Sequence, residues 1–341
     1  MEPSKSIAIT SSKLSENYNG LDLMKFLCSF LICAIHIRLW PNNLFPYSGL
    51  ISQLIKQCVA RVAVPFYFTA SGFLLFRKID PSNPDCEPIK KFCFKLLRIL
   101  GTWSILLFYG STAHLWYLGA SVIAVLILYF CYKIRLKLLH IAILAIVLYV
   151  LALTGSTYSS LLQPVTSLPI IGTIHKLYFH IFDTTRNGVF MGFPFVFLGA
   201  VFARTNFKMP MWLAVTGLFL SMMAMAIEMY IFYKLFSFND FNMLLSLVPA
   251  TFFLFYCSLS IKLKDSKVYP KLRTIGALVY YAHWMIASLI QFSLIILRKY
   301  TGLNITPFLF PLTIIVVYPL AAWIEHLSHK EKLKWVRFLY D

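Results

Sequence analysis

The sequence predicts an all-α fold, a polytopic integral membrane protein with about ten transmembrane helices and both termini in the cytoplasm. Two observations support this prediction. The chain of 341 residues is 59% hydrophobic and only 13% charged, and its mean hydropathy is +0.74. Apolar stretches recur along it, many of them close to the length of about 20 residues that a helix needs to cross a bilayer.

These stretches divide the chain into three predicted parts. Residues 1–20 form a flexible cytoplasmic tail, rich in Ser and Asn and without the apolar core of a signal peptide. Residues 21–327 form the membrane domain, and residues 328–341 form a basic cytoplasmic tail. The expected helices span about 21–40, 54–76, 91–110, 113–131, 138–156, 188–204, 209–234, 242–261, 274–297 and 306–327.

The formal charge of +18 is distributed in a way that argues against nucleic acid as a partner. Lysine and arginine gather in alternate connections between the apolar stretches, which is the positive-inside pattern of multi-pass proteins. We therefore expect a cell-membrane protein surrounded by lipids, most simply in a bacterial cytoplasmic membrane. The seven cysteines lie mostly in apolar stretches and lack ligand spacing, so neither a disulfide framework nor a metal site is expected.

The first apolar stretch carries ionisable residues along one side. At roughly 100° per residue, Lys25 and His36 lie on almost the same face, and Asp22 and Ser29 lie within about 40° of it. Ionisable groups at membrane depth usually face a protein interior or a watered cavity. Two interpretations remain open. The side chains reach the interface and a neighbouring helix, or the stripe lines a pathway in which His36 transfers protons.

A basic cluster opens the third predicted helix. Lys91, Lys95 and Arg98 are spaced at i, i+4 and i+7 and therefore share one helix face. Such a cluster can bind phosphates through charge and hydrogen bonds. The alternative is an ordinary anchor that contacts anionic lipid headgroups.

Two charged residues lie deep inside other apolar stretches. Arg61 precedes Pro65 in the second stretch, and Glu228 lies within the seventh. Each needs a partner or a cavity at that depth, so we consider an Arg61–Glu228 pair. The small residues Ser71 and Gly72 predict a close approach of two helices.

Histidine and aromatic residues mark the remaining candidates. His114 and Trp116 open the fourth predicted helix, where an interfacial aromatic belt would also explain Trp116. His283 lies well inside the ninth helix and is expected to face the bundle. Glu325 and His326, near the inner end of the tenth, are expected to extend toward the interface.

Taken together, these stretches resemble the acyltransferase-3 family of membrane acyltransferases. Leu21-Asp22-x-x-Lys25, followed by His36, is similar to the opening motif of that family. Residues 64–68 with Ser71-Gly72-Phe73 are similar to its second-span signature, and Lys95-x-x-Arg98 to its Arg-x-x-Arg pair. Residues 114–118 and 281–283 resemble two later landmarks. Lysine stands at 25 and 95 where arginine is usual, and lysine lacks the bidentate fork.

The resemblance implies an O-acyltransferase that moves an acyl group, usually acetyl, from cytoplasmic acetyl-CoA to a hydroxyl of an extracytoplasmic acceptor. His36 would be the general base, with Lys25 and Asp22 in the same site and Asp22 orienting Lys25. Acetyl-CoA would bind at Lys91, Lys95, Arg98, Arg135 and Ser71. The acceptor, a cell-envelope glycan or serine, would bind at Arg61, His114, Trp116, Glu228 and His283. No metal cofactor is implied.

Within that family, residues 62–68 are similar in sequence to the membrane half of the serine racemases of vancomycin resistance. In those proteins a soluble racemase domain follows the last span. Two alternatives to the acyltransferase follow from this similarity. The chain could be a transporter domain for a small amino acid such as L-serine, with a cavity between Arg61, Glu228 and His36. It could also be an anchor for a soluble domain beyond Asp341.

Overall fold

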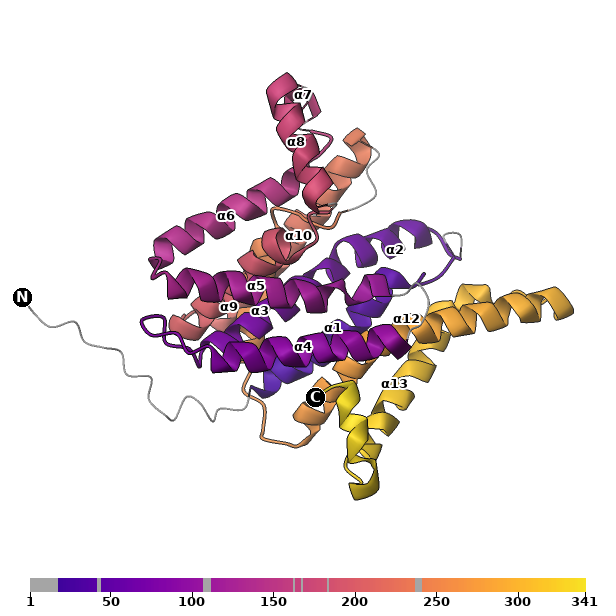
Figure 1. The fold of residues 1–341 in the computed structure, drawn as a ribbon. Coiled ribbons are helices and arrows are strands. Elements are labelled where there is room, and N and C mark those ends of the chain that lie inside the picture. Colours follow the sequence, from indigo (N-terminus) through magenta and orange to yellow (C-terminus); the bar gives the residue numbers. More distant parts are fainter. Residues whose placement is uncertain are drawn as a thin grey trace, which may run out of the picture.

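The computed structural model describes residues 18–41, 44–106, 112–161, 163–166, 168–182, 184–236 and 241–341, and the regular structure of these ranges is helical (Figure 1). The predicted N-terminal tail lies outside the described residues up to residue 17. The helices are α1 (Asn19–His36), α2 (Ser48–Gln57), α3 (Ala63–Phe76), α4 (Glu87–Leu106), α5 (Trp116–Lys133), α6 (Leu138–Thr154), α7 (Gln163–Thr166), α8 (Pro169–Phe182), α9 (Phe193–Arg204), α10 (Met211–Phe236), α11 (Leu247–Ser260), α12 (Val268–Thr301) and α13 (Leu309–Leu327). Shorter 3₁₀ or π turns are η2 (Val59–Val62), η3 (Thr112–Leu115), η4 (Gly188–Gly192), η5 (Thr306–Phe308) and η6 (Glu331–Leu339).

Within the described ranges, six helical segments are long and apolar enough to cross a membrane. They are Asn19–His36, Ser48–Phe76, Trp116–Lys133, Met211–Phe236, Val268–Thr301 and Thr306–Leu327. Leu138–Thr154, Gly188–Arg204 and Leu247–Ser260 are apolar but shorter. The predicted third span, α4, belongs to neither group because its first half is densely charged. The described structure is thus helical and compatible with a membrane protein, while the count of ten spans and the sidedness of the termini remain predictions.

The second predicted span is interrupted. Helix α2 ends at Gln57, η2 follows, and α3 begins at Ala63 with Pro65 in its first turn. Proline is tolerated there because the first N–H groups of a helix have no intrahelical acceptor. Arg61 therefore lies in the break between two helices, where side-chain oxygens can reach it, and not within a continuous helix.

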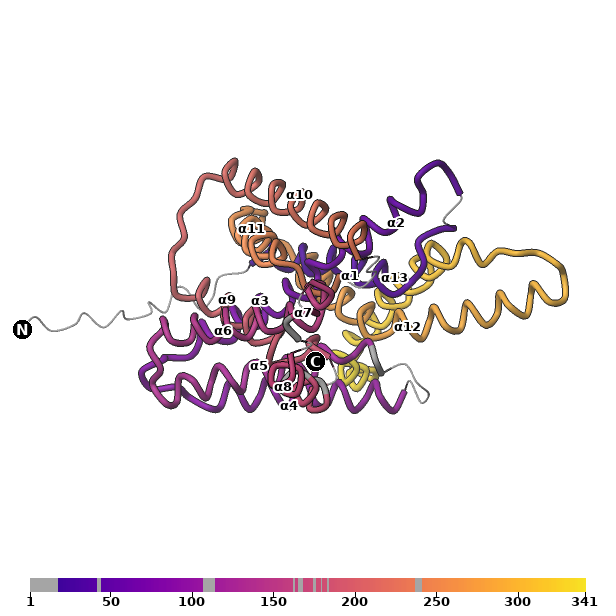
Figure 2. Tube along the Cα trace, turned by 90° about the horizontal axis from the view of Figure 1, so that it is seen from above, coloured from indigo at the N-terminus to yellow at the C-terminus, as the bar shows by residue number. Residues whose placement is uncertain are grey.

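Four helix pairs build most of the bundle. Helix α1 packs along α12 and α3 along α9, while α10 pairs with α11 and α12 with α13 (Figures 1 and 2). In the closest pair, Gly72 of α3 and Gly199 of α9 each face the main chain of the other helix. The small residues at 71–72 thus mark a close helix contact, as expected.

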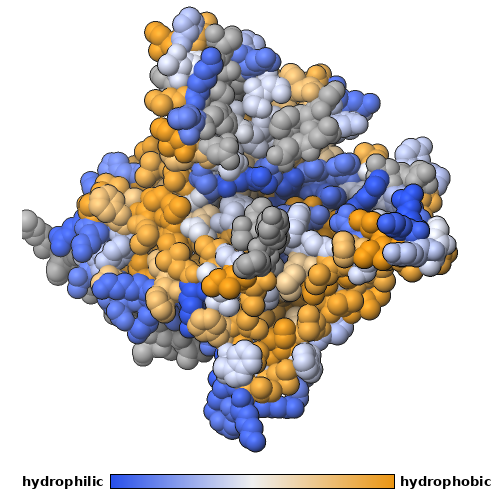
Figure 3. Space-filling model, turned by 45° about the vertical axis from the view of Figure 1, so that its right-hand side comes forward, coloured by the Kyte–Doolittle hydropathy of each residue, from blue (hydrophilic) through white to orange (hydrophobic). Residues whose placement is uncertain are grey.

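Hydrophobic side chains cover broad areas of the face drawn in Figure 3, and hydrophilic ones gather at its lower tip and in a band across its upper half. Many large apolar residues of the described chain are exposed, among them Phe219, Phe292 and Ile315. Such a surface is stable where lipid surrounds it.

The C-terminal segment folds back onto the helices. The indole Nε1 of Trp103 in α4 donates a hydrogen bond of 2.8 Å to the carbonyl oxygen of Leu339. Nε of Arg337 donates one of 3.1 Å to the carbonyl oxygen of Ser328, just after α13. The segment predicted as a basic tail therefore packs on α4 and α13.

Candidate functional site

Three imidazole rings from distant parts of the chain meet in one place. His36 ends α1, His114 lies in η3, and His283 lies in the middle of α12. The ring centroids are 5.1 Å apart for His114 and His283, 5.5 Å for His36 and His283, and 6.4 Å for His36 and His114. The sequence singled out all three but did not predict that they are neighbours. We call these three residues the imidazole cluster.

Main-chain contacts fix the orientation of His283. Its Nδ1 lies 2.9 Å from the carbonyl oxygen of Tyr280 and 3.1 Å from that of Val279. Carbonyl oxygens only accept, so Nδ1 carries the hydrogen and Nε2 of the neutral ring is an acceptor. This Nε2 is fully buried and has no hydrogen-bond partner within the described residues. His283 thus offers an unused acceptor inside the bundle.

His114 is held by the same segment of α12. Its Nε2 lies 3.1 Å from the carbonyl oxygen of Tyr281, and its own carbonyl oxygen accepts a hydrogen bond of 2.7 Å from the Tyr280 hydroxyl. The ring is 2% exposed. These contacts join the start of α5 to the middle of α12 and hold two members of the cluster together.

Trp284, which sequence analysis did not assign to the site, forms one wall of the cluster. Its ring centroid lies 5.2 Å from that of His36 at 81°, and 6.2 Å from that of His114 at 9°. Its position directly after His283 is the sequence signal for it. The ring of Trp116, a residue predicted to bind substrate, lies 6.1 Å from that of Phe68 between centroids.

Three cationic side chains, those of Arg61, Arg186 and Lys56, act electrostatically on His36. Nε of Arg61 donates a hydrogen bond of 3.0 Å to Oε1 of Gln57, and its guanidinium also contacts Oδ1 of Asn242. Arg61, within the break, is therefore connected to the end of α2 and to the segment that precedes α11.

The predicted pairing of Arg61 with Glu228 is wrong. The Glu228 carboxylate accepts hydrogen bonds from the hydroxyl of Tyr158 at 2.6 Å and from the main-chain N–H groups of Leu245 at 2.8 Å and Ser246 at 3.1 Å. These N–H groups precede α11, and such groups have no acceptor within their own helix. The carboxylate satisfies them and so has a structural role.

The opposite end of α1 carries a second charged group. The Asp22 carboxylate pairs with Arg273 of α12 at 3.1 Å, so its salt bridge is not with Lys25, the residue it was expected to orient. Asp22 nevertheless acts electrostatically on Lys25, and Arg273, Arg77 and Lys95 act on it in the opposite sense. Neither Arg77 nor Arg273 was singled out from the sequence, because both look like ordinary bases at a helix end.

The five residues expected to bind acetyl-CoA have other neighbours. Lys91 pairs with Glu87 at 3.4 Å and is largely exposed, and Lys95 pairs with Asp341 at 2.8 Å. The Arg98 guanidinium lies 4.9 Å from the centroid of the Phe338 ring. Ser71 lies 3.1 Å from the Tyr117 hydroxyl, and Arg135 is exposed between α5 and α6 with a φ of 55°.

Glu325 also differs from expectation. It does not extend to the interface but is 5% exposed, with Lys271 and His329 against its two oxygens.

Among the described residues, no group of three or more His, Cys, Asp or Glu side chains is arranged to hold a metal ion.

Three curated proteins are similar to part of this chain. An amino-acid racemase of Enterococcus faecalis is 30% identical over 209 residues, which cover 54% of this chain and 28% of the relative. A serine/alanine racemase of Enterococcus gallinarum is 27% identical over 246 residues, 61% and 32% of the two chains. A second amino-acid racemase of E. faecalis is 26% identical over 221 residues, 56% and 30% of the two chains. The chain therefore spans about a third or less of the length of each relative.

No protein-family model matches the chain, and no solved structure matches it. The expected acetyl-CoA-dependent acyltransferase activity is contradicted by the relatives, which are named racemases of amino acids. In the structure, two lysines of the expected phosphate site form exposed ion pairs, Lys91 with Glu87 and Lys95 with Asp341. What the comparisons support is similarity to the serine-racemase proteins.

Proposed function

We propose that this helical bundle is a membrane domain that binds a small amino acid such as L-serine at the imidazole cluster and carries it across a cell membrane. The observation behind the proposal is the buried Nε2 of His283, an acceptor without a partner in the described part of the chain. A buried polar group left unpaired costs about 1–3 kcal/mol. A ligand that donates an N–H or O–H to this nitrogen would recover that cost.

L-Serine has the groups that this site would recognise. Its ammonium or hydroxyl can donate to Nε2 of His283, and its ammonium can also lie over the face of Trp284, 5.2 Å from the His36 centroid. Its carboxylate would be attracted by the positive potential that Arg61, Arg186 and Lys56 create around His36. The relatives act, by their names, on amino acids and on serine and alanine.

The position of the cluster suits passage across the bundle. His36 ends a helix long enough to cross a membrane, and His283 lies in the middle of another. The half-buried polar pair Ser71–Tyr117 lies between α3 and α5, beside α12. We place the protein in the bacterial cytoplasmic membrane as a multi-pass protein, on the positive-inside pattern of its loops.

The test is uptake of labelled L-serine into proteoliposomes, with binding measured separately as the rise in unfolding temperature that L-serine causes. His283→Phe removes the acceptor while keeping a planar ring, and it is expected to abolish the serine-dependent rise and reduce uptake at least tenfold. His140→Phe, the same substitution on an exposed residue of α6, is the matched control and should change neither. Chiral analysis of the serine recovered from inside the proteoliposomes shows whether the protein also racemises it. A wild-type protein that neither binds nor transports serine would refute the proposal.

A further inference from the structure

A groove lies between the beginning of α12 and the end of α13, beside the Asp22–Arg273 pair at the start of α1. It has a volume of about 470 Å³. Its charged and imidazole lining consists of Lys267, Lys271, Arg273, Glu325, His326 and His329. It is therefore separate from the imidazole cluster, which contains the opposite end of α1.

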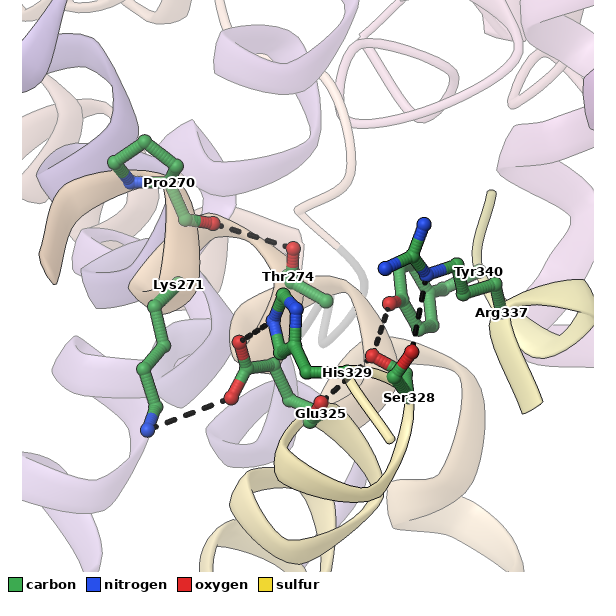
Figure 4. Close-up of polar contacts among 8 residues, drawn as sticks. All are labelled: Pro270, Lys271, Thr274, Glu325, Ser328, His329, Arg337 and Tyr340. Atoms are coloured by element: carbon green, nitrogen blue, oxygen red, sulfur yellow. Dashed lines mark hydrogen bonds and ion pairs between the residues drawn. The ribbon is translucent and has the colours of Figure 1, made fainter. Parts of the chain in front are cut away.

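Positive charge dominates this lining. Lys267, Lys271 and Arg273 outnumber the two carboxylates beside them, that of Glu325 in the lining and that of Asp22, which pairs with Arg273. The Glu325 carboxylate is already engaged, because its Oε2 lies 3.4 Å from Nζ of Lys271 and its Oε1 lies 2.9 Å from Nε2 of His329 (Figure 4). Lys271 and Arg273 remain about half exposed at the groove. An anion is the ligand class that this balance favours.

The C-terminal segment gives the groove a fixed wall. The Tyr340 hydroxyl donates a hydrogen bond of 2.7 Å to Oγ of Ser328, and Nε of Arg337 donates to the carbonyl oxygen of the same residue (Figure 4). Tyr340 itself lines the groove. The wall is thus formed before any ligand binds, which lowers the cost of ordering the site.

The surface beside the groove is that of a membrane interface. Helices α12 and α13 are both long and apolar enough to cross a bilayer. Trp323 lies three residues before His326 on the same side of α13 and is 58% exposed. Tryptophan prefers the level of lipid headgroups. Ile315 and Val316, farther along α13, are exposed apolar residues that acyl chains can cover.

We propose that this groove binds the phosphate of an anionic phospholipid. The phosphate oxygens accept charge-assisted hydrogen bonds from Lys267, Lys271 and Arg273, and the acyl chains lie along the exposed face of α13. Glu325 positions the Lys271 ammonium at the groove wall. The site is independent of the proposed amino-acid transport.

The test uses the full chain, purified in detergent and titrated with phosphatidylglycerol or phosphatidylcholine, with bound lipid counted by native mass spectrometry. The variant Lys267→Gln/Lys271→Gln removes two groove cations. The matched control Lys262→Gln/Lys264→Gln removes the same charge from exposed positions just before α12, outside the groove. Glycerol 3-phosphate and inorganic phosphate are added as soluble competitors.

Phosphatidylglycerol is expected to bind at least tenfold more tightly than phosphatidylcholine. The groove variant should lose tenfold or more of that affinity, because each lysine near an anionic headgroup contributes about fivefold. The control should lose less than threefold. Equal losses of phosphatidylglycerol affinity in both variants would show that binding depends on diffuse surface charge, and would overturn the site. Displacement by glycerol 3-phosphate at the concentration at which the lipid binds would overturn the lipid as its ligand.

Discussion

Gly72 of α3 lies directly against the main chain of Val196 in α9, so that a Cβ atom at Gly72 would overlap the carbonyl oxygen of Val196. Gly199 has the reciprocal relationship with Thr69 of α3. In a membrane, helices gain little from hydrophobic burial against one another, so small residues that allow close packing stabilise their contact. This contact holds α9 against the helix that carries Ser71.

Substitution of Gly72 is therefore expected to separate two helices. Gly72→Ala should lower the free energy of unfolding in detergent by about 2 kcal/mol or more, because the main-chain oxygen of Val196 cannot give way as a flexible side chain would. Gly101→Ala in α4 is the control, since a Cβ there meets nothing within 4 Å and alanine favours the helix by up to about 1 kcal/mol. Equal unfolding temperatures for the two variants would contradict the close contact.

The Asp22–Arg273 ion pair joins the beginnings of α1 and α12. Asp22 has a side chain only 10% exposed, whereas that of Arg273 is 50% exposed. Removing the arginine leaves a buried carboxylate without its cation, which is costlier than losing the attraction alone. We expect Arg273→Met to lower the free energy of unfolding by about 1–3 kcal/mol, discounted from a fully buried pair because the arginine is half exposed.

A double-mutant cycle tests that pair. Asp22→Asn removes the charge that Arg273 neutralises, so Arg273→Met should cost clearly less in the background of the Asp22→Asn variant than in the wild type. Chemical denaturation of the four proteins gives the coupling energy. A coupling energy indistinguishable from zero would mean that the pair adds nothing to stability.

Glu228 is predicted to act on stability by capping α11. Glu228→Ala removes the acceptor of two main-chain N–H groups and of the Tyr158 hydroxyl, at an expected cost of about 2 kcal/mol. Because Arg61 and Glu228 contact different residues, Glu228→Ala and Arg61→Ala should be additive within about 0.5 kcal/mol. A large coupling energy between the two substitutions, measured by thermal denaturation, would indicate that Arg61 and Glu228 interact directly, as the sequence suggested.

The sequence predicts the helical membrane class well because hydropathy and helix length are local properties. It also picks out His36, His114 and His283, since each is an unusual residue in an apolar stretch. What it cannot predict is which side chains contact one another. Asp22 is three residues from Lys25 in α1, yet its ion pair is with Arg273, 251 positions away. Glu228 likewise accepts hydrogen bonds from main-chain N–H groups at the start of a later helix, and does not pair with Arg61.

The same limit explains the error in function. Lys91, Lys95 and Arg98 share a helix face, and that periodicity is compatible with any anionic neighbour. Glu87, four residues before Lys91, lies on the same face and pairs with it, whereas only the folded chain shows that Asp341 pairs with Lys95 and that Phe338 lies against the arginine. The carboxylate of Asp341 comes from the far end of the sequence, where no periodicity connects it to α4.

The ion pair between Asp341 and Lys95 makes a prediction for the pH dependence of the C-terminal segment. The hydrogen bond and charge of Lys95 hold the pKa of the Asp341 carboxyl below its usual range. A carboxyl with a lowered pKa in the folded state contributes stability that is present above its unfolded pKa of about 4 and is lost as the pH drops through the folded value. Both side chains are more than a third exposed, so the contribution is expected to stay below about 1 kcal/mol.

Hydrogen exchange of residues 331–341 should therefore be constant from pH 7 to about pH 5, after correction for intrinsic rates, and its protection should decrease severalfold toward pH 3. Asp341→Asn should show the lower protection already at pH 7. Glu331→Gln, whose partner Lys334 lies within the same segment, should keep the wild-type profile. If Asp341→Asn behaved like the wild type at every pH, the segment would be held by its other contacts, those of Arg337, Leu339 and Tyr340 among them, without the ion pair.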